Sequence, residues 1–160
     1  MKIMPDISAV INAHGEGRLL QATVRSALAA IAEAQLVGLS CELIVVLDKA
    51  DGDTRAYCLE YLPVDTVVLP IAVGDLGLAR NAGVEAACGE YVAFLDGDDL
   101  WGQSWLHFAC LFMSNNSRRE LVLHPASLIY FEGKQFVWRL IDQEDDSFSR
   151  DLLVEQNLWP

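Results

Sequence analysis

The sequence alternates short β-favouring runs with helical patterns, and this alternation limits the fold more than any other feature. Apolar runs typical of strands lie at residues 7–12, 42–48, 65–71 and 91–95. Apolar residues at helical spacing lie between these runs, at residues 19–35, 51–62 and 76–88. Strands that alternate with helices form right-handed βαβ units. We therefore predict an α/β fold with a mainly parallel sheet flanked by helices.

A shorter and less regular tail is predicted beyond residue 101. Its pattern indicates a helix at residues 104–114 and two strands at residues 121–131 and 134–140. Glu132-Gly133 between those strands is typical of a hairpin. An acidic loop and a short helix at residues 148–156 follow, and we expect all 160 residues to form one domain.

The composition excludes several classes of protein. The net charge of −12, from 23 acidic and 11 basic residues, makes general nucleic-acid binding an unfavourable function. No uncharged apolar run reaches the roughly 18–20 residues of a membrane span, and no signal peptide is visible, so we expect a cytoplasmic protein. Without a CxxC pair, a zinc site or disulfide framework is not expected. Four cysteines are expected to be buried: Cys41, Cys58, Cys88 and Cys110.

Polar side chains gather where three of the predicted strands end. They lie at residues 12–16, at Asp48 and at residues 96–99. In open parallel sheets, ligands bind beyond the carboxyl ends of the strands. We therefore expect these clusters, although distant in sequence, to converge on one edge of the sheet.

Three aspartates crowd the end of the apolar and seemingly buried run at residues 91–95. Asp96, Asp98 and Asp99 repel one another unless water, a cation or a positive partner lies among them. Asp96-x-Asp98 fits a divalent cation, because Mg²⁺ takes one or two carboxylates together with phosphate oxygens and acts as a Lewis acid. A solvated turn with a helix-capping aspartate fits the same spacing. An EF-hand is excluded because Leu100 occupies the fifth position of the loop.

Four segments in order resemble a family 2 glycosyltransferase with the GT-A fold. They are SAVINAHGE at residues 8–16, ELIVVLDKADGDT at residues 42–54, GLARNAGVEAACGEYVAFLDGDD at residues 77–99, and the following LW. The resemblance implies a GT-A-like domain over residues 1–160, with a nucleotide-sugar-binding half at residues 1–105 and an incomplete acceptor-side tail at residues 106–160. It also implies Mg²⁺ or Mn²⁺, a nucleoside-diphosphate sugar donor (most often a UDP-sugar), and inverting transfer to an acceptor hydroxyl.

The resemblance assigns roles to the acids. Asp98 resembles the metal-binding second aspartate of the DxD motif, and Asp96 resembles the first, which faces the ribose and reaches the metal through water. Asp99 resembles the third acid, near the donor sugar or the acceptor. Asp48 resembles the acid that bonds the base or ribose, although a simple helix cap is the alternative.

The nucleotide loop and one arginine complete the expected donor site. The loop contains Asn12, Ala13, His14 and Glu16, and the family often has Pro or Thr, then Tyr, where this chain has Asn12 and His14. His14 could stack on the base, or it could be an exposed loop histidine. Arg80 carries a planar donor fork suited to the diphosphate or to the loop after the second strand, and an ordinary surface arginine is the alternative.

Two departures from the family pattern concern base recognition and the general base. Leu47 stands where many members have the first of two aspartates, and Lys49-Ala50 replace the usual Gly-Ser. The tail has one acidic cluster, at residues 144–146, in which Asp145 is the candidate base for the acceptor hydroxyl. A solvated loop is the alternative for that cluster, and the chain is then a donor-binding half that lacks the acceptor side.

Other functions remain open on the residues alone. In a haloacid-dehalogenase-like phosphatase, Asp96 would be the nucleophile and Asp98 the acid and base, but that motif normally opens the fold. A dinucleotide-binding domain is disfavoured because Leu20 occupies the third glycine position. A non-catalytic nucleotide-sugar-binding or interaction module is the remaining alternative. We further expect a sugar, lipid or protein acceptor, peripheral location at the inner face of a membrane as one possibility, and a possible homodimer through exposed sheet surface.

Overall fold

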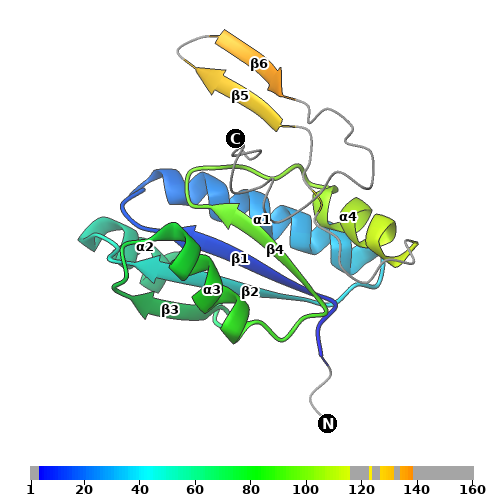
Figure 1. The fold of residues 1–160 in the computed structure, drawn as a ribbon, viewed down its shortest axis with the longest axis horizontal. Helices are drawn as coiled ribbons and strands as arrows, with labels where there is room; N and C mark the ends of the chain where they lie inside the picture. The colour runs from blue at the N-terminus through cyan, green and yellow to red at the C-terminus, as the bar shows by residue number, and fades with distance from the viewer. Residues whose placement is uncertain (1–3, 116–122, 124–126, 132–133, 139–160) are drawn as a thin grey trace, which may run out of the picture. The chain divides into compact units, whose positions relative to one another are not determined.

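Four parallel strands form the sheet of the first part of the chain (Figure 1). They are β1 (Ile7–Ala13), β2 (Cys41–Asp48), β3 (Val67–Ile71) and β4 (Tyr91–Asp96), in the order β3-β2-β1-β4. The computed structural model describes residues 4–115, 123, 127–131 and 134–138. Contacts divide the chain into two units, Met1–Arg119 and Glu120–Pro160. The predicted mainly parallel α/β fold is confirmed.

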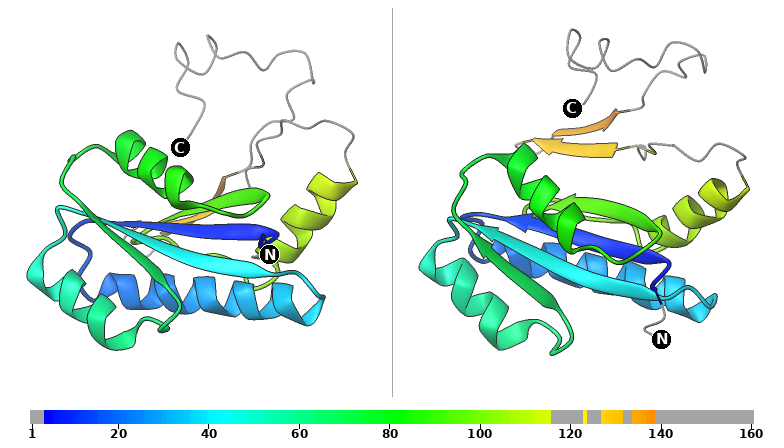
Figure 2. Two further views of the ribbon diagram at one scale, coloured as in Figure 1. Left: turned by 90° about the horizontal axis from the view of Figure 1, so that it is seen from below. Right: turned by 60° about the horizontal axis from the view of Figure 1, so that its bottom comes forward.

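Helices cover both faces of this sheet (Figure 2). They are α1 (Leu19–Leu36), α2 (Gly52–Tyr61), α3 (Leu76–Ala86) and α4 (Trp105–Ser114). The apolar core of α1 and α4 lies against one face of β1, and α3 packs against the other. All seven residues of β1 are buried, as expected for a central strand covered on both sides.

Side chains of β1 alternate between the two apolar clusters. Ile7 and Ile11 pack with the buried stripe of α1, whereas Val10 packs with Val46 and Ala79 on the α3 side. This alternation follows from the period of two along a strand. This alternation matters for function because the residue two positions after Val10, near the carboxyl end of β1, also faces α3.

Several expectations need correction in detail. β3 begins at Val67 because Thr66 N–H donates to Pro63 O in a turn. Helix α3 ends at Ala86, two residues before the end of the predicted helical pattern, and a Cβ on Gly89 would lie 2.6 Å from a backbone nitrogen of β1. Strand β4 is an edge strand with Phe94 38% exposed, so the expectation of a buried strand was wrong.

The cysteines are less uniformly buried than predicted. Cys58 is buried, Cys41 and Cys110 are half-buried, and Cys88 is exposed. Cys88 follows the end of α3, where the chain turns toward the edge strand and has little to cover it. All four are free thiols, in agreement with the absence of a disulfide framework.

The second unit contains the predicted hairpin. Strands β5 (Ser127–Phe131) and β6 (Lys134–Trp138) pair antiparallel, with Phe131 opposite Lys134. The predicted helix at residues 148–156 and the acidic loop lie outside the described residues, and the division at residue 105 stays a prediction. Within the described part of the chain, no helix combines the length and the apolar character needed to cross a membrane.

Candidate donor site at the carboxyl ends of the strands

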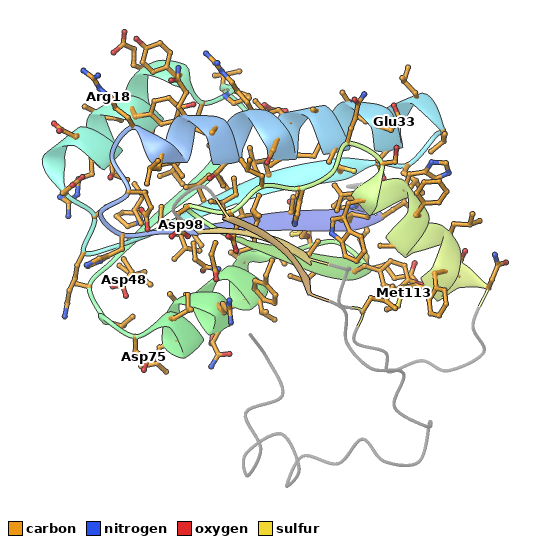
Figure 3. The ribbon with its side chains drawn as sticks, turned by 90° about the horizontal axis from the view of Figure 1, so that it is seen from above. Arg18, Glu33, Asp48, Asp75, Asp98 and Met113 are labelled. Atoms are coloured by element: carbon orange, nitrogen blue, oxygen red, sulfur yellow. The ribbon has the colours of Figure 1, made fainter. Side chains whose placement is uncertain are left out.

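A cleft of about 310 Å³ lies at the carboxyl ends of β1, β2 and β4. Figure 3 shows Asp48, Asp75 and Asp98 at this end of the sheet. The predicted site residues that line the cleft are Asn12, Ala13, His14, Glu16, Asp48, Asp96 and Asp98. The expected convergence of the three polar clusters is therefore confirmed.

Five lining residues were missed by sequence reasoning. They are Gly74, Asp75, Leu76, Ala79 and Gly97. A signal for part of this set was present, because Gly-Asp before a helical pattern is typical of a turn followed by an N-cap. Asp75 is indeed the N-cap of α3, and its Oδ1 accepts from Leu78 N–H at 2.8 Å.

The strand register explains why the key polar groups share one face. Asn12 pairs with Asp96 on β4 and with Val46 on β2, and residues paired in parallel strands point to the same side. Val46 packs on the α3 side of the sheet. Asn12, Asp96 and, two residues beyond Val46, Asp48 therefore lie on the α3 face.

The amide of Asn12 is buried without a partner in the described structure. The residue is 6% exposed, and neither Oδ1 nor Nδ2 makes a hydrogen bond. Buried side-chain polar groups nearly always have a hydrogen-bond partner, and leaving one unpaired costs about 1–3 kcal/mol. This donor and acceptor in the cleft are consequently open to a ligand.

The carboxylate of Asp48 is held by the loop that follows β3. Oδ1 accepts from Val73 N–H at 2.8 Å and Gly74 N–H at 2.9 Å, while Oδ2 accepts from Gly74 N–H at 2.7 Å and Asp75 N–H at 3.2 Å. These bonds, that of Gly74 first, hold the pKa of Asp48 below its usual value. Asp51, and not Asp48, caps α2, so the helix-cap alternative for Asp48 is wrong.

Asp96 has an arginine as its positive partner. Nη2 of Arg80, on α3, donates to both Asp96 oxygens at 2.9 and 3.0 Å. The same guanidinium lies 5.9 Å from the centre of the Phe94 ring, a cation–π distance. Arg80 is therefore neither a free surface residue nor bound to the Asp48 loop, and its charge offsets the repulsion between the crowded aspartates.

Asp98 differs from the other acids of the cleft. Asp48, Asp75 and Asp96 have the partners given above, and Glu16 Oε2 accepts from a backbone N–H of the nucleotide loop at 2.6 Å. Asp98 is exposed, and none of its described neighbours donates to its carboxylate. Asp98 is therefore the cleft carboxylate without a described hydrogen-bond partner.

The third aspartate and the turn that carries it are also defined. Desolvation first, and then the charges of Asp98 and Asp96, raise the pKa of Asp99. Asp99 N–H donates to Asp96 O at 3.0 Å, and Thr23 Oγ1, from α1, donates to Gly97 O at 2.8 Å. Within the described residues, no group of three or more His, Cys, Asp or Glu side chains is arranged to hold a metal ion alone.

His14 links the nucleotide loop to the end of β2. Its Nδ1 bonds Asp48 O, and a carbonyl can only accept, so Nδ1 carries the hydrogen and Nε2 is free. The ring is exposed at the cleft. Its orientation is fixed by this bond, while its predicted stacking on a base stays a prediction.

The sequence model of the family described as Glycosyl transferase family 2 matches residues 8–121. The chain belongs to this family. A Bacillus subtilis (strain 168) relative, named as a teichuronic acid biosynthesis glycosyltransferase, TuaG, is 34% identical over 79 residues, which are 48% of this chain and 31% of the relative. An Escherichia coli relative, the UDP-Glc:alpha-D-GlcNAc-diphosphoundecaprenol beta-1,3-glucosyltransferase WfgD, is 33% identical over 78 residues, 48% of this chain and 30% of the relative.

Solved structures share the fold of this chain. The S. aureus TarS 1-349 complex with UDP-GlcNAc matches with a TM-score of 0.57 and 23% identity, over 68% of this chain and 31% of that one. At this identity the likeness shows the fold, which is of the GT-A type. The chain spans less than a third of the length of these two curated relatives.

Not every predicted site residue lines the cleft of the described structure. Asp145, the candidate general base, lies outside the described residues. Its role stays a prediction. Arg80 also does not line the cleft itself, and it reaches the cleft through Asp96.

Proposed function

We propose that this chain is the donor-binding part of a glycosyltransferase that binds a nucleoside-diphosphate sugar and transfers the sugar to an acceptor hydroxyl. The proposal rests on two groups in the cleft. The buried amide of Asn12 has no described hydrogen-bond partner, and among the acids that line the cleft Asp98 alone lacks one. An amide suits a nucleoside, which offers both donors and acceptors, and a free carboxylate suits a cation.

The proposed cofactor is Mg²⁺ or Mn²⁺, and the donor set fits it. Carboxylate oxygens are the hard ligands these ions prefer, and Mg²⁺ is commonly held by one or two carboxylates together with substrate phosphates. The lack of a three-ligand cluster in the described chain agrees with a metal that arrives with the diphosphate. Asp98 would hold it, and it would supply Lewis-acid stabilisation of the departing diphosphate. Without a cation, the acidic cleft would repel that diphosphate.

The surrounding residues have distinct proposed roles. Arg80 fixes Asp96, which then faces the ribose with a set orientation. In the reaction, the bond from the anomeric carbon to the diphosphate breaks, a bond to the acceptor oxygen forms, and a general base takes the hydroxyl proton. Asp99, whose pKa is raised, lies near the sugar or the acceptor, and Asp145 is the proposed base. Inversion at the anomeric carbon follows from the family resemblance.

A UDP-sugar is the proposed donor class. Support comes from the UDP-Glc in the name of the E. coli relative and from the UDP-GlcNAc complex of TarS. The acceptor is a hydroxyl of a sugar, lipid or protein, and a cytoplasmic location, at the inner face of a membrane for a lipid acceptor, belongs to the same proposal. A homodimer is a further expectation. A non-catalytic binding module would share the donor site and lack transfer.

Isothermal titration calorimetry tests the donor site. UDP is titrated into the 160-residue chain with Mn²⁺ or with a chelator, using the wild type, Asp98→Asn and a control, Asp53→Asn. Asp53 is an exposed acid of α2 outside the cleft, so its substitution changes the charge equally. The proposal predicts binding that requires Mn²⁺, is lost in Asp98→Asn and persists in Asp53→Asn. If the wild type does not bind UDP in the presence of Mn²⁺, the proposal is refuted.

A further inference from the structure

Lys49, directly after β2, adopts an unusual backbone conformation at the edge of the cleft. Its φ is 49°, and it is the one non-glycine residue of the described chain with a positive φ. Glycine and asparagine adopt this left-handed region more readily than lysine does. The position is fixed because Lys49 N–H donates to Ile71 O at 3.0 Å. A backbone outlier of this kind beside a binding cleft warrants a functional explanation.

The side chain of Lys49 runs over Gly74, which lines the cleft. A Cβ on Gly74 would lie 3.1 Å from Lys49 Cε and would collide with Nζ, so the ammonium group occupies the space that any other residue at position 74 would fill. Gly74 has a φ of 70° and donates to both oxygens of Asp48. Lys49 makes no ion pair with any described residue, so its hydrogen-bond donors are open at this rim.

Asp48 is poorly placed to read a base by itself. Its two oxygens already accept from three backbone N–H groups of the loop after β3, which use most of the acceptor capacity of a carboxylate. If Asp98 holds the cation and diphosphate at the end of β4, the base lies toward the end of β2, on the other side of β1. Lys49 directly follows Asp48 at that end, and its side chain reaches Gly74 of the cleft.

We propose that Lys49 determines base specificity by donating a hydrogen bond to the 4-oxo group of the donor's base. This inference rests on the nucleotide-sugar function proposed above and adds to it the residue that distinguishes the base. An ammonium group has donors and no acceptor, so it pairs with the carbonyl oxygen of uracil and cannot pair with the amino group at the same position of cytosine. The chain therefore selects an oxo base over an amino base.

Comparing UDP with CDP tests this directly, because the two differ only in the base. Calorimetry of the 160-residue chain with Mn²⁺ is expected to show wild-type preference for UDP of about tenfold or more, the range of one charge-assisted hydrogen bond. In Lys49→Met, which keeps most of the aliphatic chain, that preference is expected to fall to within about twofold through weaker UDP binding. Lys49→Arg should keep the preference, because it keeps a cationic donor.

A second variant separates the ammonium group from the backbone strain. Lys49→Gly removes the donor and also suits the positive φ, so it should melt at a temperature at or above that of the wild type while losing the preference for UDP. An unchanged UDP-to-CDP ratio in Lys49→Met overturns the inference and leaves the donor-site proposal standing. Equal weakening of both nucleotides also overturns it, because Lys49 would then bind the phosphates. If the wild type binds neither nucleotide, the proposed function itself fails.

Discussion

The hydroxyl of Thr23 holds the turn between Asp96 and Asp98, and its removal should weaken both the fold and the site. Thr23 is fully buried on α1, and its Oγ1 donates to Gly97 O at 2.8 Å. Thr23→Val keeps the shape of the side chain and leaves that carbonyl without its donor. The expected loss of unfolding free energy is about 1–3 kcal/mol, the cost of an unsatisfied buried polar group.

A matched threonine provides the control. Thr66 Oγ1 is buried with no partner in the described structure, so Thr66→Val removes a hydroxyl that makes no bond. Replacing an unpaired buried polar group by an apolar group of the same shape should be neutral or stabilising. Urea denaturation of the two variants and the wild type measures the difference.

The same variants also separate stability from the site. Calorimetry with UDP and Mn²⁺ should show weaker binding in Thr23→Val, because Gly97 lies between Asp96 and Asp98, and unchanged binding in Thr66→Val. Equal destabilisation by both substitutions, or a Thr23→Val variant as stable as the wild type, would show that this hydrogen bond does not support the turn.

Two further predictions concern close packing and acid stability. Gly89→Ala places a Cβ 2.6 Å from a β1 backbone nitrogen and should lower the unfolding free energy by about 1–3 kcal/mol, whereas Gly52→Ala, with open space around it, should not; urea denaturation compares them. The backbone N–H of Gly74, first among the bonds to Asp48, lowers the pKa of that carboxyl in the folded state below its value in the unfolded chain. Its stabilising contribution is therefore complete above the unfolded-state pKa and lost as pH falls through the folded-state pKa. Thermal melts in acid should show a shallower fall for Asp48→Asn, and an identical fall would refute the assignment.

Local patterns predicted the architecture and the location of the site well. The βαβ alternation required a parallel sheet, and parallel strands bring their carboxyl ends together, so residues 12–16, Asp48 and residues 96–99 had to meet. Asp51 as a cap for α2 also follows from a sequence signal, since its side chain bonds the residue three positions later.

Partners set by packing could not be predicted in this way. Arg80 reaches Asp96 because α3 packs on the face of the sheet to which Asp96 points, and the sequence alone left open whether Arg80 has a partner and which one. The bond from Thr23 to Gly97 joins residues 74 positions apart through the packing of α1. The close approach of Gly89 to β1 depends on where the chain crosses the sheet edge, which no local pattern shows.

In the proposed site, a divalent cation would join Asp98 to the diphosphate of a nucleotide sugar. Electron paramagnetic resonance of Mn²⁺ measures the free ion, which loses signal when it binds the 160-residue chain. We predict that UDP markedly increases Mn²⁺ uptake by the wild type and by Asp53→Asn, and that Asp98→Asn abolishes this increase. Mn²⁺ uptake that is independent of UDP, or equal in Asp98→Asn and the wild type, would contradict the account.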